Sequence, residues 1–141
     1  MDYLEGEIDY HIGIMKILRR VTQEDSHCLY VGQQFPGIAA TVARRANHYS
    51  METEAQEDSI AFVRNYLRFG VLANNVDADL VDSIIAIGVQ FNSIKKSDPK
   101  AEQIKAHINQ CIAHLTKIPH LQNRMSALTA RTNYKANPDS Q

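Results

Sequence analysis

The chain has 141 residues, of which 44% are hydrophobic and 22% are charged, and its formal net charge is −1. This length and composition exclude a disordered or fibrous chain and suit one globular domain with its own core. The longest apolar run, at 84–89, is far shorter than the ~20 residues of a membrane-spanning helix, and the acidic N-terminus is unlike a secretory signal. We therefore expect a cytoplasmic protein without a membrane segment, whose cysteines, Cys28 and Cys111, are free thiols.

The hydrophobic pattern has a helical period throughout and contains no convincing strand, which predicts an all-α protein. The first helix is expected at about 2–23, where residues of one face recur every three or four positions: Leu4, Ile8, His11, Met15 and Leu18. Ile17 and Val21 widen this stripe, so we expect the helix to be covered on more than one side, centrally or at a subunit interface. The polar stretch 24–34 contains Gly32 and is expected to be a connection.

Boundary residues mark the later helices. Pro36 and Pro99 suit a first helical turn, where a missing N–H costs nothing, and Asp77 suits an N-cap. Pro119 is expected to interrupt the helical pattern. We therefore expect helices at about 36–49, 53–73, 77–94, 99–118 and 121–133. Residues 1–132 would form a single helical domain, followed by a polar, disordered tail at 133–141.

The short links between these helices favour antiparallel neighbours in a helical bundle of about five to six helices. Our first expectation is a four-helix core with extra short helices. The alternative is a globin-like, irregular helical packing, because unequal helix lengths and Gly or Pro interruptions disturb a regular bundle.

A candidate metal site lies in the helix expected at 99–118. His107, Cys111 and His114 are four and three residues apart, which places them on one helical stripe. Imidazole and thiolate are the ligands that zinc and copper prefer. A fourth ligand would have to come from elsewhere, for example from Glu7 or His11 in the first helix. The alternative interpretation is that these side chains simply border the core.

Charge is divided unevenly along the chain. Residues 1–94 carry a balance of −6 and residues 95–141 a balance of +5. This division predicts either docking of the basic region onto an acidic surface of a second copy or partner, or pairing of opposite charges within the chain. Nucleic acid is not the expected partner, because no stacking aromatic residues are interleaved among the basic ones. Arg64 and Arg68 are one helical turn apart and could together hold a carboxylate or phosphate.

Catalytic signatures are missing from the sequence. No serine lies in a nucleophile elbow, and no glycine-rich phosphate loop is present. We therefore expect a non-enzymatic protein-interaction module without a cofactor, such as an adaptor, chaperone or regulatory subunit, acting as a homodimer through the first helix. The residues expected to take part are Ile8, His11, Met15, Arg64 and Arg68. The alternative is a metal-binding bundle, a sensor or oxidoreductase, that holds a transition metal such as zinc on the stripe at 107–114.

Overall fold

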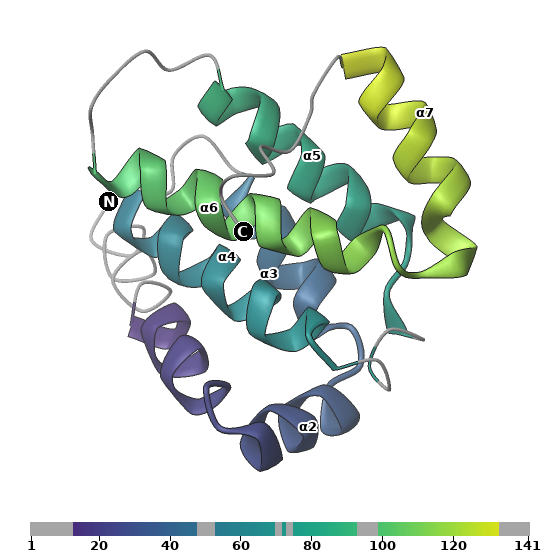
Figure 1. Cartoon of the computed structure of the whole chain (residues 1–141). Helices are drawn as coiled ribbons and strands as arrows, with labels where there is room; N and C mark the ends of the chain where they lie inside the picture. Colours follow the sequence, from purple (N-terminus) through teal and green to yellow (C-terminus); the bar gives the residue numbers. More distant parts are fainter. Residues whose placement is uncertain (1–12, 48–52, 70–71, 73–74, 93–98, 133–141) are drawn as a thin grey trace, which may run out of the picture.

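The chain is an all-α helical bundle (Figure 1). The computed structural model describes residues 13–47, 53–69, 72, 75–92 and 99–132, and every regular element within these ranges is a helix. None of the helices in this part of the chain is both long and apolar enough to cross a membrane. The predicted tail at 133–141 and positions 2–12 of the predicted first helix lie outside the described residues.

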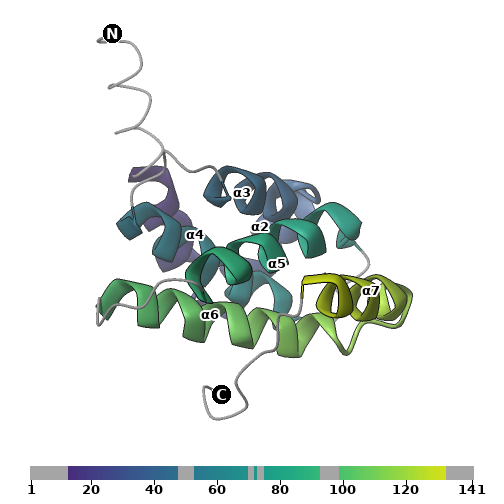
Figure 2. The same cartoon turned by 90° about the horizontal axis from the view of Figure 1, so that it is seen from above.

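The core is made by four helices: α3 (Ile38–Ala46), α4 (Thr53–Leu67), α5 (Ala78–Asn92) and α6 (Pro99–Leu115). They pack in the order α3, α4, α6, α5 and back to α3, which closes a ring (Figure 2). The side chains that fill this ring are large, apolar and fully buried: Ile60, Phe62, Val63, Ile84, Ile104, Ile108 and Leu115. The four-helix core expected from the sequence is confirmed.

Several helix ends lie where the boundary residues predict them. The backbone N–H of Leu80 donates to Asp77 Oδ1 at 3.3 Å, so Asp77 caps α5. Pro99 is the first residue of α6. The chain then turns through the short 3₁₀ helix η2 (Pro119–Leu121) into α7 (Gln122–Thr132), which packs on α5. The apolar positions predicted for this last helix are buried: Leu121, Met125 and Leu128.

The stretch expected to be a connection, 24–34, instead contains the helix α2 (Asp25–Gln34). Only Cys28 and Gly32 are buried along α2, so it has almost no apolar stripe for the sequence to reveal. Gly32 does not break the helix. A Cβ at this position would lie 2.6 Å from Cδ1 of the buried Leu72, so glycine lets α2 approach the bundle closely.

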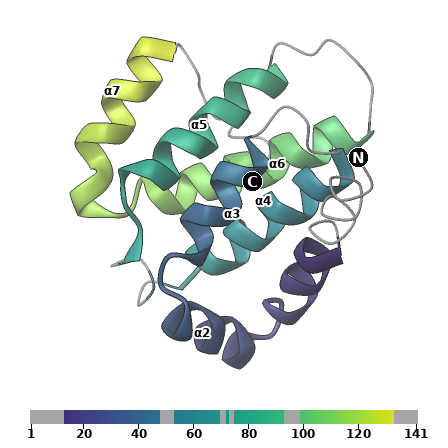
Figure 3. The same cartoon turned by 180° about the vertical axis from the view of Figure 1, so that it is seen from behind.

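The helical residues 13–21, called here the N-terminal segment, lie beside α4 (Figure 3). Met15 is buried in the core with an exposed fraction of 3%. Ile17 is 60% exposed and Val21 is 36% exposed. Within the chain, the apolar stripe of this helix is therefore covered at Met15 and open at Ile17 and Val21.

Candidate functional site

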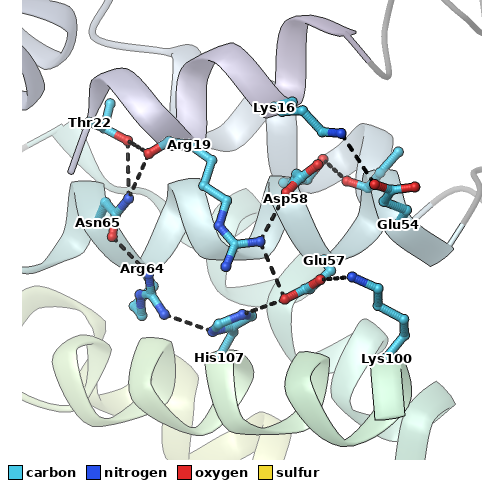
Figure 4. Close-up of polar contacts among 12 residues, drawn as sticks. Lys16, Arg19, Thr22, Glu54, Glu57, Asp58, Arg64, Asn65, Lys100 and His107 are labelled. Atoms are coloured by element: carbon cyan, nitrogen blue, oxygen red, sulfur yellow. Dashed lines mark hydrogen bonds and ion pairs between the residues drawn. The ribbon is translucent and has the colours of Figure 1, made fainter. Parts of the chain in front are cut away.

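Polar side chains attach the N-terminal segment to α4 (Figure 4). Lys16 Nζ lies 3.3 Å from Glu54 Oε1. One turn further, Arg19 Nη1 lies 2.9 Å from Asp58 Oδ1 and 3.3 Å from Glu57 Oε2. Glu57 and Asp58 are both buried, so these contacts bring Arg19 against the bundle rather than into solvent.

The end of the N-terminal segment is held by Asn65 of α4 and by Arg68, which directly follows α4. Asn65 Nδ2 donates to the Arg19 carbonyl at 3.3 Å and to Thr22 Oγ1 at 3.2 Å. Arg68 Nη2 donates to the carbonyls of Thr22 and Gln23 at 3.1 and 3.2 Å. These carbonyls follow the last helical turn, where a positive charge is favoured by the helix dipole. α4 and Arg68 therefore hold the segment at Lys16, at Arg19 and at the turn that follows it.

Glu57 is the centre of this network, because it joins the N-terminal segment, α4 and α6. It accepts hydrogen bonds from Lys100 Nζ at 2.8 Å and from His107 Nε2 at 3.2 Å, and it pairs with Arg19. Burial by itself would raise the pKa of Glu57. The hydrogen bonds from Lys100 and His107 and the charge of Arg19 nevertheless hold that pKa below its usual value. The carboxylate is therefore ionised at neutral pH.

His107 connects Glu57 to Arg64. Arg64 Nη1 lies 2.8 Å from His107 Nδ1, and a guanidinium can only donate, so Nδ1 accepts and the ring proton is assigned to Nε2. Burial and the neighbouring Arg64 charge lower the pKa of His107, although its hydrogen bond to Glu57 acts in the opposite direction. The ring is therefore neutral at pH 7, and both of its nitrogens have partners within the chain.

The predicted metal stripe gains no support from this geometry. Cys111 is fully buried, its Sγ lies 3.9 Å from the Ile60 carbonyl, and burial raises the pKa of its thiol to about 12. His114 is half-buried, and burial lowers its pKa. Among the described side chains, no group of three or more His, Cys, Asp or Glu residues is placed to hold a metal ion. The metal site at His107, Cys111 and His114 stays a prediction.

The residues predicted to take part in protein interaction are placed differently from one another. Ile8 and His11 lie outside the described residues. Met15 is buried in the core, so it is not available to a partner. Arg64 points to His107 on α6, whereas Arg68 points to the N-terminal segment and to Asp25 Oδ1 at 3.0 Å. The structure therefore uses the two arginines in separate internal contacts.

The uneven charge along the sequence is in part neutralised within the chain. Lys100 pairs with Glu57, and Arg124 Nη2 lies 2.8 Å from Asp82 Oδ2. Both contacts join a basic residue of the C-terminal third to an acidic residue of the first two thirds. Internal pairing, one of the two alternatives from the sequence, therefore accounts for these two basic residues.

The outer surface of the N-terminal segment joins Ile17 and Val21, which the sequence assigned to the widened apolar stripe, to two basic side chains that sequence reasoning did not select, Lys16 and Arg20. We call Lys16, Ile17, Arg20 and Val21 the outer face, because all four are exposed. An open pocket of about 280 Å³ adjoins this face and is lined by Lys16, Arg19, Arg20, Gln23 and Asp58. The basic and polar positions 16, 19, 20 and 23 have helical spacing, which is the signal that could have predicted this pocket.

Comparison with protein-family models, with curated proteins and with solved structures gave no match. Two arrangements of side chains in the structure therefore bear on function. One is the buried ion network around Glu57, and the other is the outer face that this network holds in place.

Proposed function

We propose that the chain is a non-enzymatic protein-interaction module that binds a protein partner on the outer face of the N-terminal segment. The observation that carries this proposal is the orientation of the segment. A surface helix ordinarily turns apolar side chains toward the core and charges toward solvent. Here Arg19 is directed at the buried carboxylates of α4, while Ile17 is 60% exposed. Neighbouring exposed apolar side chains can form an interaction site, and Val21, one helical turn from Ile17, is exposed too.

The attachment of the segment supports the proposal. Contacts to Glu54, Glu57, Asp58 and Asn65 of α4, and to Arg68 just after it, fix the segment on the bundle. A face that is already ordered loses less conformational entropy on binding than a flexible one. The polar attachment also leaves the apolar residues of the outer face free for a partner.

Adaptor, chaperone and regulatory roles all require such a face, and the homodimer expected from the sequence would use it too. We also propose a cytoplasmic location. Cys28 and Cys111 are free and buried, which suits a reducing compartment.

The test is site-specific photocrosslinking from two exposed apolar positions. A photoreactive amino acid is introduced at Ile17 or, as a matched control, at Val89 on α5, which is 39% exposed. We expect the same protein adduct repeatedly at position 17 and not at 89. The purified adduct partner should then bind the Ile17→Asp variant at least about tenfold more weakly than wild type, a loss of about 1.4 kcal/mol. Equal adducts at both positions, or none at 17, would contradict the proposal.

A further inference from the structure

The outer face carries two parallel rows of side chains, one apolar and one basic. Ile17 and Val21 form the apolar row, and Lys16 and Arg20 form the basic row beside it. We infer, building on the proposed function, that the partner presents an acidic amphipathic helix. Its apolar side chains cover Ile17 and Val21, and its carboxylates bind Arg20 and Lys16 at the adjoining pocket.

The spacing of the two rows fits a helix. Residues four apart on a helix lie about one 5.4 Å turn from each other. A partner helix that crosses the segment at a shallow angle repeats its own side chains at the same interval, so both rows can be matched at once. The outer face therefore suits a helix with an apolar stripe and one charged edge.

The charges of the pocket indicate the sign of that edge. Arg19 is already paired with Glu57 and Asp58, and Lys16 shares a half-exposed ion pair with Glu54. Among the described residues, the Arg20 guanidinium has no hydrogen bond or ion pair. A guanidinium without a partner is matched best by a carboxylate, which it can bind with two parallel hydrogen bonds.

A second copy of this chain is a poorer match for the same surface. Residues 13–21 contain Lys16, Arg19 and Arg20 but no acidic residue. When two copies of the outer face meet, the basic rows find no opposite charge on the partner's segment, and apposed like charges oppose association. The surface therefore favours a different, acidic chain over the homodimer expected from the sequence.

The experiment uses two synthetic helical peptides of equal length as probes. Both carry leucines along one stripe, and the leucines are flanked by glutamates in one peptide and by lysines in its twin. We expect fluorescence anisotropy to show that the full chain binds the glutamate peptide at least about tenfold more tightly than the lysine twin, with an affinity that falls as salt is added. Arg20→Glu should remove this preference. Arg44→Glu, the same charge change on an exposed residue of α3, should keep it.

The remaining outcomes separate this inference from the proposed function. If both peptides bind equally and Ile17→Asp abolishes both, the interaction face stands and the acidic partner is wrong. If both bind but Ile17→Asp changes neither affinity, the proposed face fails as well. If neither peptide binds, the acidic helix is wrong. A dimeric mass in light scattering that Ile17→Asp converts to a monomer would also overturn the inference, because a second copy would then occupy the face.

Discussion

α4 contributes to two regions of the molecule with opposite kinds of side chain. In the four-helix core it presents Ile60, Phe62 and Val63, all fully buried. Against the N-terminal segment it presents Glu57 and Asp58, which are nearly as well buried. The core is therefore held by apolar packing, whereas the attachment of the segment combines the buried Met15 with paired charges that are in part open to solvent.

The stability of the two regions depends on different conditions. Apolar burial stabilises by about 25 cal/mol per Å² and is insensitive to protonation. The attraction between buried charges offsets the cost of removing them from water only when every charged group has a partner. In the described structure one buried atom of the second region, Asp58 Oδ2, has no hydrogen-bond partner. The attachment of the segment is therefore the weaker of the two regions and the one that responds to pH.

The largest expected effect is a cavity in the core. Phe62→Ala removes a fully buried ring that lies 6.3 Å, centroid to centroid, from that of Tyr66. We expect the free energy of unfolding to fall by about 3–5 kcal/mol. Urea denaturation followed by circular dichroism measures this loss. A loss below about 1 kcal/mol would mean that the core does not depend on Phe62 packing as described.

A smaller and more local effect is expected when the ion network loses its centre. Glu57→Gln leaves Arg19, Lys100 and His107 without their carboxylate, and we expect a loss of about 1–3 kcal/mol in unfolding free energy. Hydrogen exchange should show that Glu57→Gln speeds up the exchange of the amides at 13–21 more than that of the amides in α5.

Glu102→Gln is the matched control for Glu57→Gln, because this carboxylate is 64% exposed and pairs with Lys105 at 3.5 Å. Glu102→Gln should lower the free energy of unfolding by less than about 1 kcal/mol. An equal loss in the two variants would contradict the special role of the buried network.

The same network should make stability depend on pH. The pKa of His107 is below its usual value of 6.5 in the folded chain, so the unfolded chain binds more protons as pH falls past 6.5. The contribution of His107 to the free energy of unfolding is therefore fully present above about pH 6.5 and is lost as the pH falls toward the lower pKa that His107 has in the folded chain. His107→Gln should reduce the loss measured between about pH 7.5 and about pH 5.5.

Two other histidines sharpen the pH measurement. Burial lowers the pKa of His114 too, so some dependence of the same sign should remain in His107→Gln. His27→Gln, which alters an exposed histidine outside the network, serves as the matched control variant. A pH dependence unchanged by His107→Gln would refute the role of the network.

The smallest effect is expected on the outer face. Ile17→Ser should change the free energy of unfolding by no more than about 0.5 kcal/mol, because the side chain is 60% exposed and its loss opens no cavity. Thermal unfolding at pH 7 tests this. A large destabilisation would show that Ile17 contributes to the fold, and the outer face would lose its assignment to a partner.

The apolar helices could be predicted because their boundaries and burial follow from local rules. Asp77 caps α5, Pro99 begins α6, and Leu121, Met125 and Leu128 are buried as their spacing predicts. α2 could not be predicted, since only Cys28 and Gly32 are buried along it. Its remaining packing comes from the half-buried Leu29 and Val31, so the buried face of α2 is narrow and includes a glycine.

The candidate site depended on contacts that spacing does not encode. Spacing identifies neighbours on one helix only, so it predicts a group of His107, Cys111 and His114. The hydrogen-bond partners of His107 are Arg64 and Glu57, which are 43 and 50 residues away. The folded bundle brings them to the imidazole.

The sequence by itself determined that this protein is an all-α bundle, because helical period, caps and proline positions are local properties of the chain. It also determined that the first helix carries apolar side chains on more than one side. Met15 and Arg19 share one row and Ile17 and Val21 share another, with the same period. Only the tertiary structure decided which row faces the bundle, because that choice depends on the buried carboxylates Glu57 and Asp58. A buried charge must be paired, and this requirement turns Arg19 inward and leaves Ile17 outside.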